Sequence, residues 1–284
     1  MQKVYLNGSL RDKESVKISP FDRGFLFGDA VYEVIPVYQQ RPFAVDFHYQ
    51  RLLRNLELID IKAPFTFDRF ISLLHSLINQ PCRPDNFAVY LQVSRGDSGS
   101  RSHVISKAMN PTVFAFLQPR ELISKDTYRL GCKAILQEDI RWRKSHIKTT
   151  SLLANVLHLS QAKKQNASEV LLHDNGVFTE GASSNVFFSI SGQLVTPLLS
   201  EKIIPGTTRY RVIEVAKKLG IVVKEQLCSL NILNEVDEII LTGGTKELMP
   251  IVLLDDKVIG VGKPGPVWHK LFDAYQELFH DCVN

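Results

Sequence analysis

The chain has 284 residues, which corresponds to about two domains at roughly 150 residues each. Hydrophobic residues make up 44% and charged residues 23%, which is the composition of a folded globular protein and excludes a collagen-like or disordered chain. The formal net charge is +4 and no run of about five or six like charges occurs, so charge does not indicate nucleic-acid binding.

Targeting and cysteine patterns favour a cytoplasmic protein. The N-terminus lacks the basic start and apolar stretch of a secretory signal, and no apolar run approaches the ~20 residues that span a bilayer. The four cysteines are too sparse for a disulfide framework or a zinc site, so we expect reduced thiols; they are Cys82, Cys132, Cys228 and Cys282.

Residues 1–118 predict a mixed α+β domain. Short strand-forming runs bounded by turn residues predict strands, and apolar residues at helical spacing after Asp46, a candidate N-cap, predict an amphipathic helix. The expected strands are 3–9, a pair within 31–43 around Gln39-Gln40, 87–94 and 112–118, and the expected helices are 47–59 and 67–78, with Pro81 behind the second. The polar stretch 119–128, which shows no clear period, predicts an interdomain linker.

Residues 129–284 predict a larger, β-rich domain. Turn residues separate two hairpins, and Gly220 is a suitable C-terminal cap for a helix. The expected elements are strand 132–137, helix 152–164, hairpins 169–180 and 185–196, helix 208–219, strands 238–241 and 251–254, and helix 267–279. The fold class is therefore a two-domain mixture of α+β and α/β.

A cluster of cations precedes the first helix of this second domain. The segment 141–148 reads R-W-R-K-S-H-I-K, while metal motifs, nucleotide-binding glycine loops and Gly-x-Ser-x-Gly elbows are absent from the sequence. One interpretation of this cluster is a basic surface exposed to solvent. Lys148 differs from its neighbours because it lies between Ile147 and Thr149-Thr150, where the chain turns inward, and an amine placed there can act as a nucleophile.

Three further segments combine small, hydroxylic and charged residues. Segment 178–185 reads F-T-E-G-A-S-S-N, segment 205–209 reads P-G-T-T-R, and segment 241–247 reads L-T-G-G-T-K-E. The second opens a helix after a glycine, and the free N–H groups of a helix N-terminus bind phosphate well. Taken singly, each segment is equally an ordinary turn or helix cap.

The order of these segments, with an arginine on the first helix and F-G-D-A-V-Y-E at 27–33, resembles the fold-type IV pyridoxal-phosphate enzymes. That family contains the branched-chain and D-amino acid aminotransferases and aminodeoxychorismate lyase, and the resemblance runs from Tyr5 to about Trp268. It implies a D-amino acid aminotransferase-like fold, with a smaller N-terminal α+β domain and a larger, barrel-like C-terminal domain. It also implies pyridoxal 5'-phosphate as the cofactor.

The resemblance assigns roles to individual residues. Lys148 would form the Schiff base with the cofactor and move the proton, and it is preferred to Lys144 because it alone occupies the family position before the helix. Glu180 would face the pyridine nitrogen and keep it protonated. The phosphate would be bound by Arg51, Thr207, Thr208, Gly244 and Thr245, with His48 and Arg141 supporting the site. Gly243-Gly244 departs from the hydroxyl residues often found there in D-amino acid enzymes, so contacts at that point would come from the backbone.

The segment 93–103, V-S-R-G-D-S-G-S-R-S-H, bears on the subclass. It resembles the carboxylate trap of D-amino acid aminotransferases, in which Arg101 and His103 would reach across a homodimer interface and act with Tyr32 of the main subunit. The alternative is an exposed polar loop. The resemblance implies transamination between D-alanine or D-glutamate and a 2-oxo acid such as 2-oxoglutarate or pyruvate, with no nucleic-acid or membrane partner.

Three other functions stay open at the level of the sequence. The same fold could serve as an aminodeoxychorismate lyase, for which the Arg-x-His loop has no evident use, or as a branched-chain L-amino acid aminotransferase, which needs an apolar pocket and a different carboxylate clamp. A non-catalytic cofactor-binding protein would retain the fold without the activity. An enantiomer-resolved assay and the absorbance of the protein with its cofactor separate these possibilities.

Overall fold

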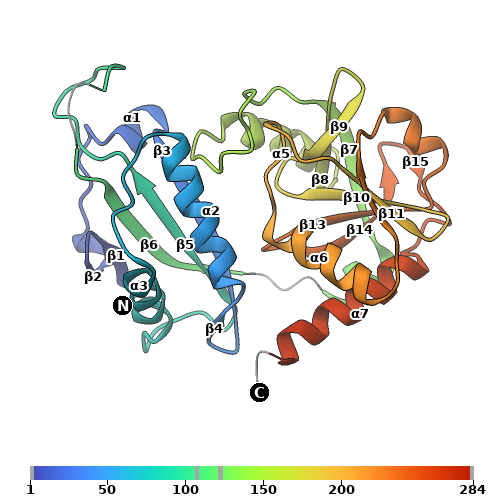
Figure 1. The fold of residues 1–284 in the computed structure, drawn as a ribbon, viewed down its shortest axis with the longest axis horizontal. Helices are drawn as coiled ribbons and strands as arrows, with labels where there is room; N and C mark the ends of the chain where they lie inside the picture. The colour runs from blue at the N-terminus through green and yellow to red at the C-terminus, as the bar shows by residue number, and fades with distance from the viewer. Residues whose placement is uncertain (1–2, 106–108, 121–123, 282–284) are drawn as a thin grey trace. The chain divides into compact units, whose positions relative to one another are not determined.

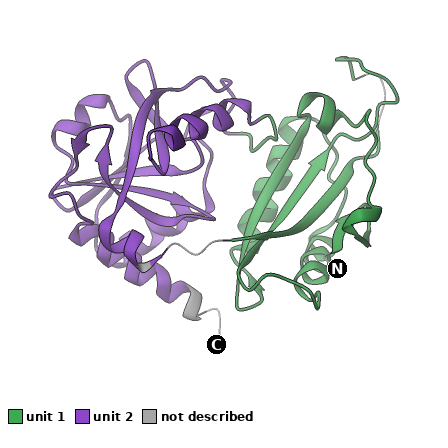
Figure 2. Cartoon of the chain, turned by 180° about the vertical axis from the view of Figure 1, so that it is seen from behind, with its two compact units in different colours: residues 1–122, 147–151 green, residues 123–146, 152–284 purple. Residues whose placement is uncertain are grey.

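The computed structural model of the chain describes residues 3–105, 109–120 and 124–281. The chain forms two compact units, which are coloured separately in Figure 2. The first contains residues 1–122 and 147–151, and the second contains residues 123–146 and 152–284. Each unit has its own sheet and its own apolar core (Figure 1).

The described part of the first unit contains a six-stranded antiparallel sheet in the order β2-β1-β6-β5-β3-β4. Its strands are β1 (Lys3–Leu6), β2 (Ser9–Asp12), β3 (Ala30–Tyr38), β4 (Arg41–Pro42), β5 (Phe87–Ser94) and β6 (Thr112–Pro119). The predicted turns are confirmed: Asn7, Gln39 and Gln40 have positive φ values of 45°, 47° and 66°, and each joins two antiparallel strands.

The helices of this unit are α1 (Arg23–Phe27), α2 (Val45–Leu58) and α3 (Phe67–Ile78), with the 3-10 turn η1 (Lys13–Ser15). The two predicted helices are confirmed, but the prediction of Asp46 as N-cap is wrong. Ala44 is the N-cap, at a φ of 52°, because the chain leaves β4 through a left-handed residue, and Asp46 lies in the first turn. Helix α1 was not predicted, since its five residues are too short to show a period.

One face of the sheet packs against α2 and α3, and the other carries aromatic side chains. Cross-strand pairing puts Glu33, Leu91, Ala115 and Tyr5 in one row on the helix-covered face. Tyr32, one residue from Glu33 on the same strand, therefore faces the opposite side. There its ring stacks on Tyr90 with centroids 5.6 Å apart.

The second unit contains, within the described residues, a nine-stranded sheet in the order β12-β11-β10-β13-β14-β7-β8-β9, with β15 paired to β14. Its strands are β7 (Cys132–Glu138), β8 (Glu169–Asp174), β9 (Val177–Gly181), β10 (Asn185–Ile190), β11 (Gln193–Pro197), β12 (Val223–Gln226), β13 (Glu238–Gly243), β14 (Glu247–Leu254) and β15 (Lys257–Val258). The pairs β11–β12, β14–β7 and β7–β8 are parallel. Both predicted hairpins are confirmed.

This sheet curls into a barrel-like shape. Strand β9 ends the strand order at one side, yet Val177 bridges Ser229, which follows β12 at the other side. The Phe178 N–H also donates to the Cys228 carbonyl at 2.7 Å. Alternate residues point inward to one core, as Val186 and Phe188 on β10 illustrate. The predicted barrel-like second domain is thus confirmed.

The helices of the second unit are α4 (Lys125–Leu130), α5 (Leu153–Lys164), α6 (Thr207–Lys218) and α7 (Pro266–Asp281), with the 3-10 helix η2 (Leu230–Asn234). The predicted linker is partly helical, because α4 forms within it and Tyr128 packs on Trp268 and Phe272 at ring distances of 5.8 and 4.5 Å. Residues 121–123 of that linker lie outside the described residues.

Residues 147–151 pack with the first unit, whereas the sequence prediction kept Lys148 in the second domain. Thr149 forms a β-bridge with Val31, and the Tyr32 N–H donates to the Lys148 carbonyl at 2.9 Å. Ile147 belongs to the apolar core of the first unit. These backbone and core contacts are the reason why the segment leaves the unit that contains its neighbours in sequence.

Candidate active site

The first unit buries a carboxylate between a histidine and an arginine. Glu33 lies on β3, fully buried, and faces His48 and Arg51, which are three residues apart on one face of α2. Arg51 Nε donates to Glu33 Oε1 at 2.8 Å, and Arg51 Nη2 donates to Oε2 at 2.6 Å. His48 Nδ1 lies 2.7 Å from Oε2. The bidentate arrangement fixes the guanidinium plane.

The charges of this cluster are well defined. Burial raises the pKa of Glu33, but the charge and hydrogen bonds of Arg51 and the hydrogen bond of His48 outweigh burial and bring the pKa down to about 2. Burial lowers the pKa of His48, and the charges of Arg51 and Lys148 add to this effect against the attraction of Glu33. A neutral His48 must donate from Nδ1 to the ionised Glu33, which leaves Nε2 as an acceptor. That atom is buried and has no hydrogen-bond partner among the described residues.

Lys148 lies beside Tyr32, with its ammonium nitrogen 4.2 Å from the centre of the Tyr32 ring. The hydroxyls that follow it hold the segment in place: Thr149, Thr150 and Ser151 all donate to the Gly28 carbonyl, at 3.1, 3.3 and 3.3 Å. Gly28 has a φ of +65°, and a Cβ there would lie 2.4 Å from Ser151 Oγ. Glycine is therefore required for this close approach.

Lys144, the rival lysine, has a different environment. Its side chain is 58% exposed and lies 3.9 Å from Glu201 in a surface ion pair of the second unit. Trp142 and Arg143 are exposed as well, whereas Ser145 and Ile147 are buried. The exposed part of the basic segment is therefore residues 142–144, whereas the Arg141 side chain before them is buried and Ile147 belongs to a core.

Arg101 and His103 lie in an exposed loop after β5 that Figure 1 shows extending beyond the sheet. Both contact Phe27 of α1: the guanidinium carbon of Arg101 is 5.4 Å and the ring of His103 is 5.2 Å from the centre of the Phe27 ring. Arg23 donates to the carbonyls of Ser102 and His103 and pairs with Asp29 at 2.7 Å. The loop is thus attached through its backbone, and its cationic side chains stay exposed.

In the second unit, Glu180 on β9 is a buried carboxylate that accepts only from N–H donors. Arg141 Nη1 donates to Oε1 at 2.6 Å, while Asn185 Nδ2 and the Ile204 N–H donate to Oε2 at 2.9 and 3.0 Å. Asp139 holds the same Arg141 from the other side through Nε and Nη2, at 2.9 and 2.8 Å. Arg141 therefore bridges two carboxylates.

This sharing changes the electrostatics of Glu180. Burial raises the pKa of Glu180 to about 7, against the charge and hydrogen bond of Arg141, and the negative charge of Asp139 adds to the rise. Burial also raises the pKa of Asp139, but the hydrogen bonds and charge of Arg141 outweigh it and lower the pKa overall. Near neutral pH, Glu180 can consequently gain or lose a proton.

The start of α6 lies beside this carboxylate. Thr207 and Thr208 are buried, and Gly206 before them is the N-cap. A Cβ on Gly206 would lie 2.0 Å from Asn185 Oδ1, so Asn185 joins Glu180 to the start of α6. The first N–H groups of an α-helix have no acceptor within the helix, which makes this end suitable for an anion.

The β13–β14 turn holds Gly244 and Thr245. Lys246 next to them donates to the buried Glu169 at 2.6 Å, and Glu169 also accepts from the hydroxyls of Ser183 and Ser184 at 2.7 and 3.0 Å. Lys246, to which sequence reasoning gave no role, thereby ties this turn to segment 178–185. Thr242 at the end of β13 is buried, and its hydroxyl has no partner among the described residues.

Sequence reasoning missed four buried residues that organise these clusters: Glu33, Asp139, Glu169 and Asn185. A signal existed for Glu33, because it alternates with Val31 and Ile35 on a buried strand face, where a carboxylate needs a cationic partner. Asp139 carried no such signal, since it lies after the end of a strand and its contact with Thr179 is 40 residues away in sequence, although its main partner Arg141 is only two residues away.

Within the described residues, no group of three or more His, Cys, Asp or Glu residues is placed to hold a metal ion. None of the described helices combines the length and apolar character needed to cross a membrane.

Comparisons with known proteins identify the family. The family model described as amino-transferase class IV matches residues 30–254. The D-alanine aminotransferase of Staphylococcus aureus strain N315 is 31% identical over 277 residues, 98% of this chain and 98% of that protein. The D-alanine aminotransferase of Listeria monocytogenes serotype 1/2a strain 10403S is 35% identical over 282 residues, 99% of this chain and 97% of that protein.

Solved structures share the fold. The branched-chain amino acid aminotransferase of Escherichia coli superposes with a TM-score of 0.89 at 24% identity, covering 98% of this chain and 94% of that chain. A T.th. branched-chain amino acid aminotransferase, solved with pyridoxamine 5'-phosphate, gives a TM-score of 0.86 at 22% identity, covering 98% and 94%. The chain belongs to the class IV aminotransferase family and is a fold-type IV, pyridoxal-phosphate-dependent aminotransferase.

Proposed function

We propose that this aminotransferase transfers the amino group between a D-amino acid, D-alanine or D-glutamate, and a 2-oxo acid, pyruvate or 2-oxoglutarate. The observation that carries the proposal is the similarity, over 98% of the chain, to proteins described as D-alanine aminotransferases. The sequence Arg101-x-His103 adds a cationic loop suited to a carboxylate. A cytoplasmic homodimer belongs to the same proposal.

The residues of each unit fit the cofactor. In the first unit, the buried, unpartnered Nε2 of His48 and the Lys148 ammonium mark a polar place near Arg51. In the second unit, register pairs Thr242 with Asn185, so the unpartnered Thr242 hydroxyl lies on the face of Asn185, which contacts Glu180. Donors such as the Thr242 hydroxyl and the N–H groups at the start of α6 suit an anionic phosphate, and the Glu180 carboxylate suits a protonated ring nitrogen, whereas Nε2 of a neutral His48 can only accept a hydrogen bond from the ligand.

Pyridoxal phosphate, when bound, supplies a cationic ring that withdraws the electron pair left at Cα of the amino acid. We assign Lys148 as the residue whose amine would hold the cofactor and, once the substrate amino group has displaced it, would take the proton from Cα as a free base, and Glu180 as the carboxylate that would keep the ring nitrogen protonated. Asp139, Arg141 and Asn185 orient Glu180 through the contacts described above. Arg51, Thr207, Thr208, Gly244 and Thr245 are assigned to the phosphate.

The carboxylate of the substrate would be held by Arg101 and His103, together with the Tyr32 hydroxyl. An arginine fork matches a carboxylate in two hydrogen bonds, and histidine and tyrosine donors fix its orientation. A fixed carboxylate presents one face of Cα to Lys148, so these three residues would select the enantiomer.

The test is an enantiomer-resolved assay of purified enzyme loaded with pyridoxal phosphate. We expect D-alanine and 2-oxoglutarate to give pyruvate and D-glutamate. Lys148→Ala should lower the rate by about 10²–10⁴-fold or more, because it removes both the amine and the proton carrier. The matched control Lys144→Ala, at an exposed lysine of the same segment, should retain the wild-type rate.

Preferred transfer from L-leucine would instead place the enzyme with the branched-chain aminotransferases, and conversion of aminodeoxychorismate to an aromatic acid and pyruvate would make it a lyase. Either result overturns the D-amino acid proposal. Equal activity of Lys148→Ala and wild type would remove the assignment of Lys148.

Subunit mixing tests the homodimer. If Arg101 serves the active site of the neighbouring subunit, Arg101→Ala and Lys148→Ala are both inactive alone. Random re-association should then restore about a quarter of the wild-type activity, because half of the dimers are mixed and each carries one complete site. The absence of any recovery, with both variants confirmed to exchange subunits, would show that Arg101 does not act across an interface.

A further inference from the structure

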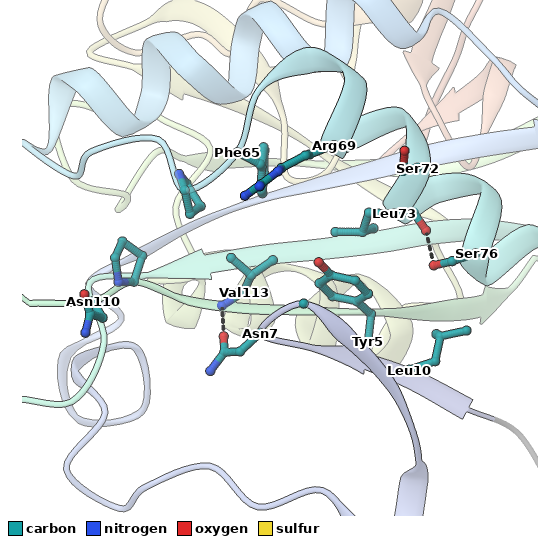
Figure 3. A pocket seen from close by; sticks show the side chains of 13 residues that line it. Tyr5, Asn7, Leu10, Phe65, Arg69, Ser72, Leu73, Ser76, Asn110 and Val113 are labelled. Carbon is teal, nitrogen blue, oxygen red and sulfur yellow. Dashed lines mark hydrogen bonds between the residues drawn. The ribbon is translucent and has the colours of Figure 1, made fainter.

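A cavity lies in the first unit, lined by residues other than those assigned to catalysis (Figure 3). Its volume is about 640 Å³, within the range of roughly 300–1,000 Å³ typical of small-molecule sites. Its walls come from the β1–β2 hairpin, the start and exposed flank of α3, and the segment that enters β6.

The strand order separates this cavity from Lys148 and Tyr32. Tyr5 lines it from β1, and β6 and β5 stand between β1 and β3, which carries Tyr32. Tyr5 is in the row of Glu33, on the face that α3 covers, whereas Tyr32 faces the opposite side of the sheet. A ligand here would therefore occupy a site separate from Tyr32 and Lys148.

The charge of the cavity is positive. Arg69 of α3 lines it, and Arg69 forms no ion pair within the part of the chain that the structure describes. None of the described residues that line the cavity carries a carboxylate. Burial raises the pKa of Tyr5, while a backbone hydrogen bond from Gly8 and the nearby charge of Arg69 oppose the rise, so the phenol stays neutral.

The charged group and the side-chain amides lie toward one side. Asn7 Oδ1 accepts from the Val113 N–H at 2.8 Å, which commits the oxygen and leaves the amide nitrogen as a donor. In Figure 3, Asn7, Asn110 and the guanidinium of Arg69 lie toward one side, whereas Leu10 and Leu73 lie toward the other, together with Ser72 and Ser76. The cavity thus has a cationic side with amide donors, and a side that combines aliphatic side chains with two serine hydroxyls.

We propose that this cavity binds a small organic carboxylate with a short apolar body. The carboxylate would pair with Arg69 and accept from the side-chain amides, since guanidinium and carboxylate form charge-assisted hydrogen bonds. The aliphatic part would lie against Leu10 and Leu73 and remove their apolar surface from water. A cation is excluded because it would face Arg69 without a counter-charge.

The experiment is calorimetric titration of the holoenzyme with 4-methylpentanoate, which has no amino or oxo group and so is not turned over. The titration should show one binding event at the cavity, besides any binding at the active site. Arg69→Gln should weaken binding at the cavity, referred to here as the cavity component, by about 10-fold or more, as expected for loss of a charged hydrogen-bond partner. The neutral amide 4-methylpentanamide should bind the wild type more weakly by a similar factor. Arg129→Gln, at an exposed arginine of the second unit that does not line the cavity, is the matched control and should bind like the wild type.

Ser76→Phe gives a second, independent variant, because it fills the cavity while Arg69 remains. Ser76→Phe should also abolish the binding of 4-methylpentanoate at the cavity. Inhibition of transamination by the same carboxylate reports the active site separately, and its inhibition constant should be unchanged in both variants. If Arg69→Gln and Ser76→Phe leave every binding component unchanged, or if the amide binds as tightly as the acid, the proposal is overturned.

Discussion

Glu33 in the first unit and Glu180 in the second are both buried carboxylates that accept a guanidinium hydrogen bond at 2.6 Å, yet their acidities diverge. The pKa of Glu33 falls to about 2, whereas that of Glu180 rises to about 7. Burial acts in the same direction on both. The difference lies in the partners: Arg51 gives Glu33 two hydrogen bonds and His48 adds a third, whereas Arg141 gives Glu180 one and is held by Asp139 as well.

The comparison teaches that the balance of charge around an arginine, and not its presence, sets the acidity of a buried carboxylate. Glu33 is therefore a permanent anion that fixes α2 to the sheet. Glu180 is a carboxyl group whose proton occupancy changes near neutral pH, as suits a partner of a protonated ring nitrogen.

The largest expected effect is on stability in the first unit. Glu33→Gln removes the buried carboxylate to which Arg51 donates two hydrogen bonds, which should lower the free energy of unfolding by about 3–5 kcal/mol. Urea unfolding of the apoprotein measures it. The control Glu138→Gln removes a half-exposed carboxylate that pairs with His173, and should cost about 1 kcal/mol or less. Similar losses in the two variants would contradict a special role for the buried pair.

The second prediction concerns pH. The folded-state pKa of Glu180 lies above its ordinary value of 4.5, so its stabilising contribution is complete below pH 4.5 and is lost as pH rises through about 7. Glu180→Gln cannot titrate. The stability of the wild-type apoprotein relative to Glu180→Gln should therefore fall by up to about 3 kcal/mol over this interval.

Glu33→Gln serves as the contrast in this pH series. Because the pKa of Glu33 is about 2, the folded-state titration of this carboxylate lies below the interval, so the difference between Glu33→Gln and the wild type should change far less than that of Glu180→Gln between about pH 5.5 and 7. A pH-independent difference for Glu180→Gln as well would remove the distinction between the two carboxylates.

The smallest expected effect separates the contribution of Asp139. Asp139→Asn removes a negative charge that raises the pKa of Glu180, so the pH midpoint of the Glu180 effect should move down by about one unit, equivalent to about 1.4 kcal/mol. This midpoint is obtained by measuring the free energy of unfolding of Asp139→Asn and of the double variant Asp139→Asn/Glu180→Gln as a function of pH, and taking their difference. Asp174→Asn, which pairs with Lys202 at the surface, should not move it. An unchanged or higher midpoint in Asp139→Asn contradicts the sharing of Arg141.

Much of the fold follows from local sequence patterns. The Asn7-Gly8 and Gln39-Gln40 turns, the alternation along β5 and the helical spacing of α3 are all local, and all are confirmed. What failed was either too short to show a period, as in α1, or depended on an unusual backbone angle, as at Ala44. The packing of residues 147–151 with β3 is a long-range contact that no local pattern reports.

The candidate site was predictable in its residue types and less so in its connections. The roles of Lys148 and Glu180 came from the resemblance to a family, and they remain proposals. That Arg141 contacts Glu180 accords with its expected supporting role. No role could be assigned to Asp139, Asn185 and Glu169, because each also contacts a segment far away in sequence: Thr179 donates to Asp139, Asn185 donates to the Ile204 carbonyl, and Lys246 donates to Glu169.

The placement of residues 147–151 has a consequence for dissecting the protein. The first unit is discontinuous, because its sheet and core take in a five-residue piece that lies beyond the boundary at residue 122. A fragment ending at residue 122 would lack Ile147 and the partner of Val31, and would carry an uncovered apolar edge. A first unit that folds alone therefore needs residues 147–151 attached through a new loop. After a single proteolytic cut near residue 122, the two fragments would stay associated through the contacts of residues 147–151 with the first unit.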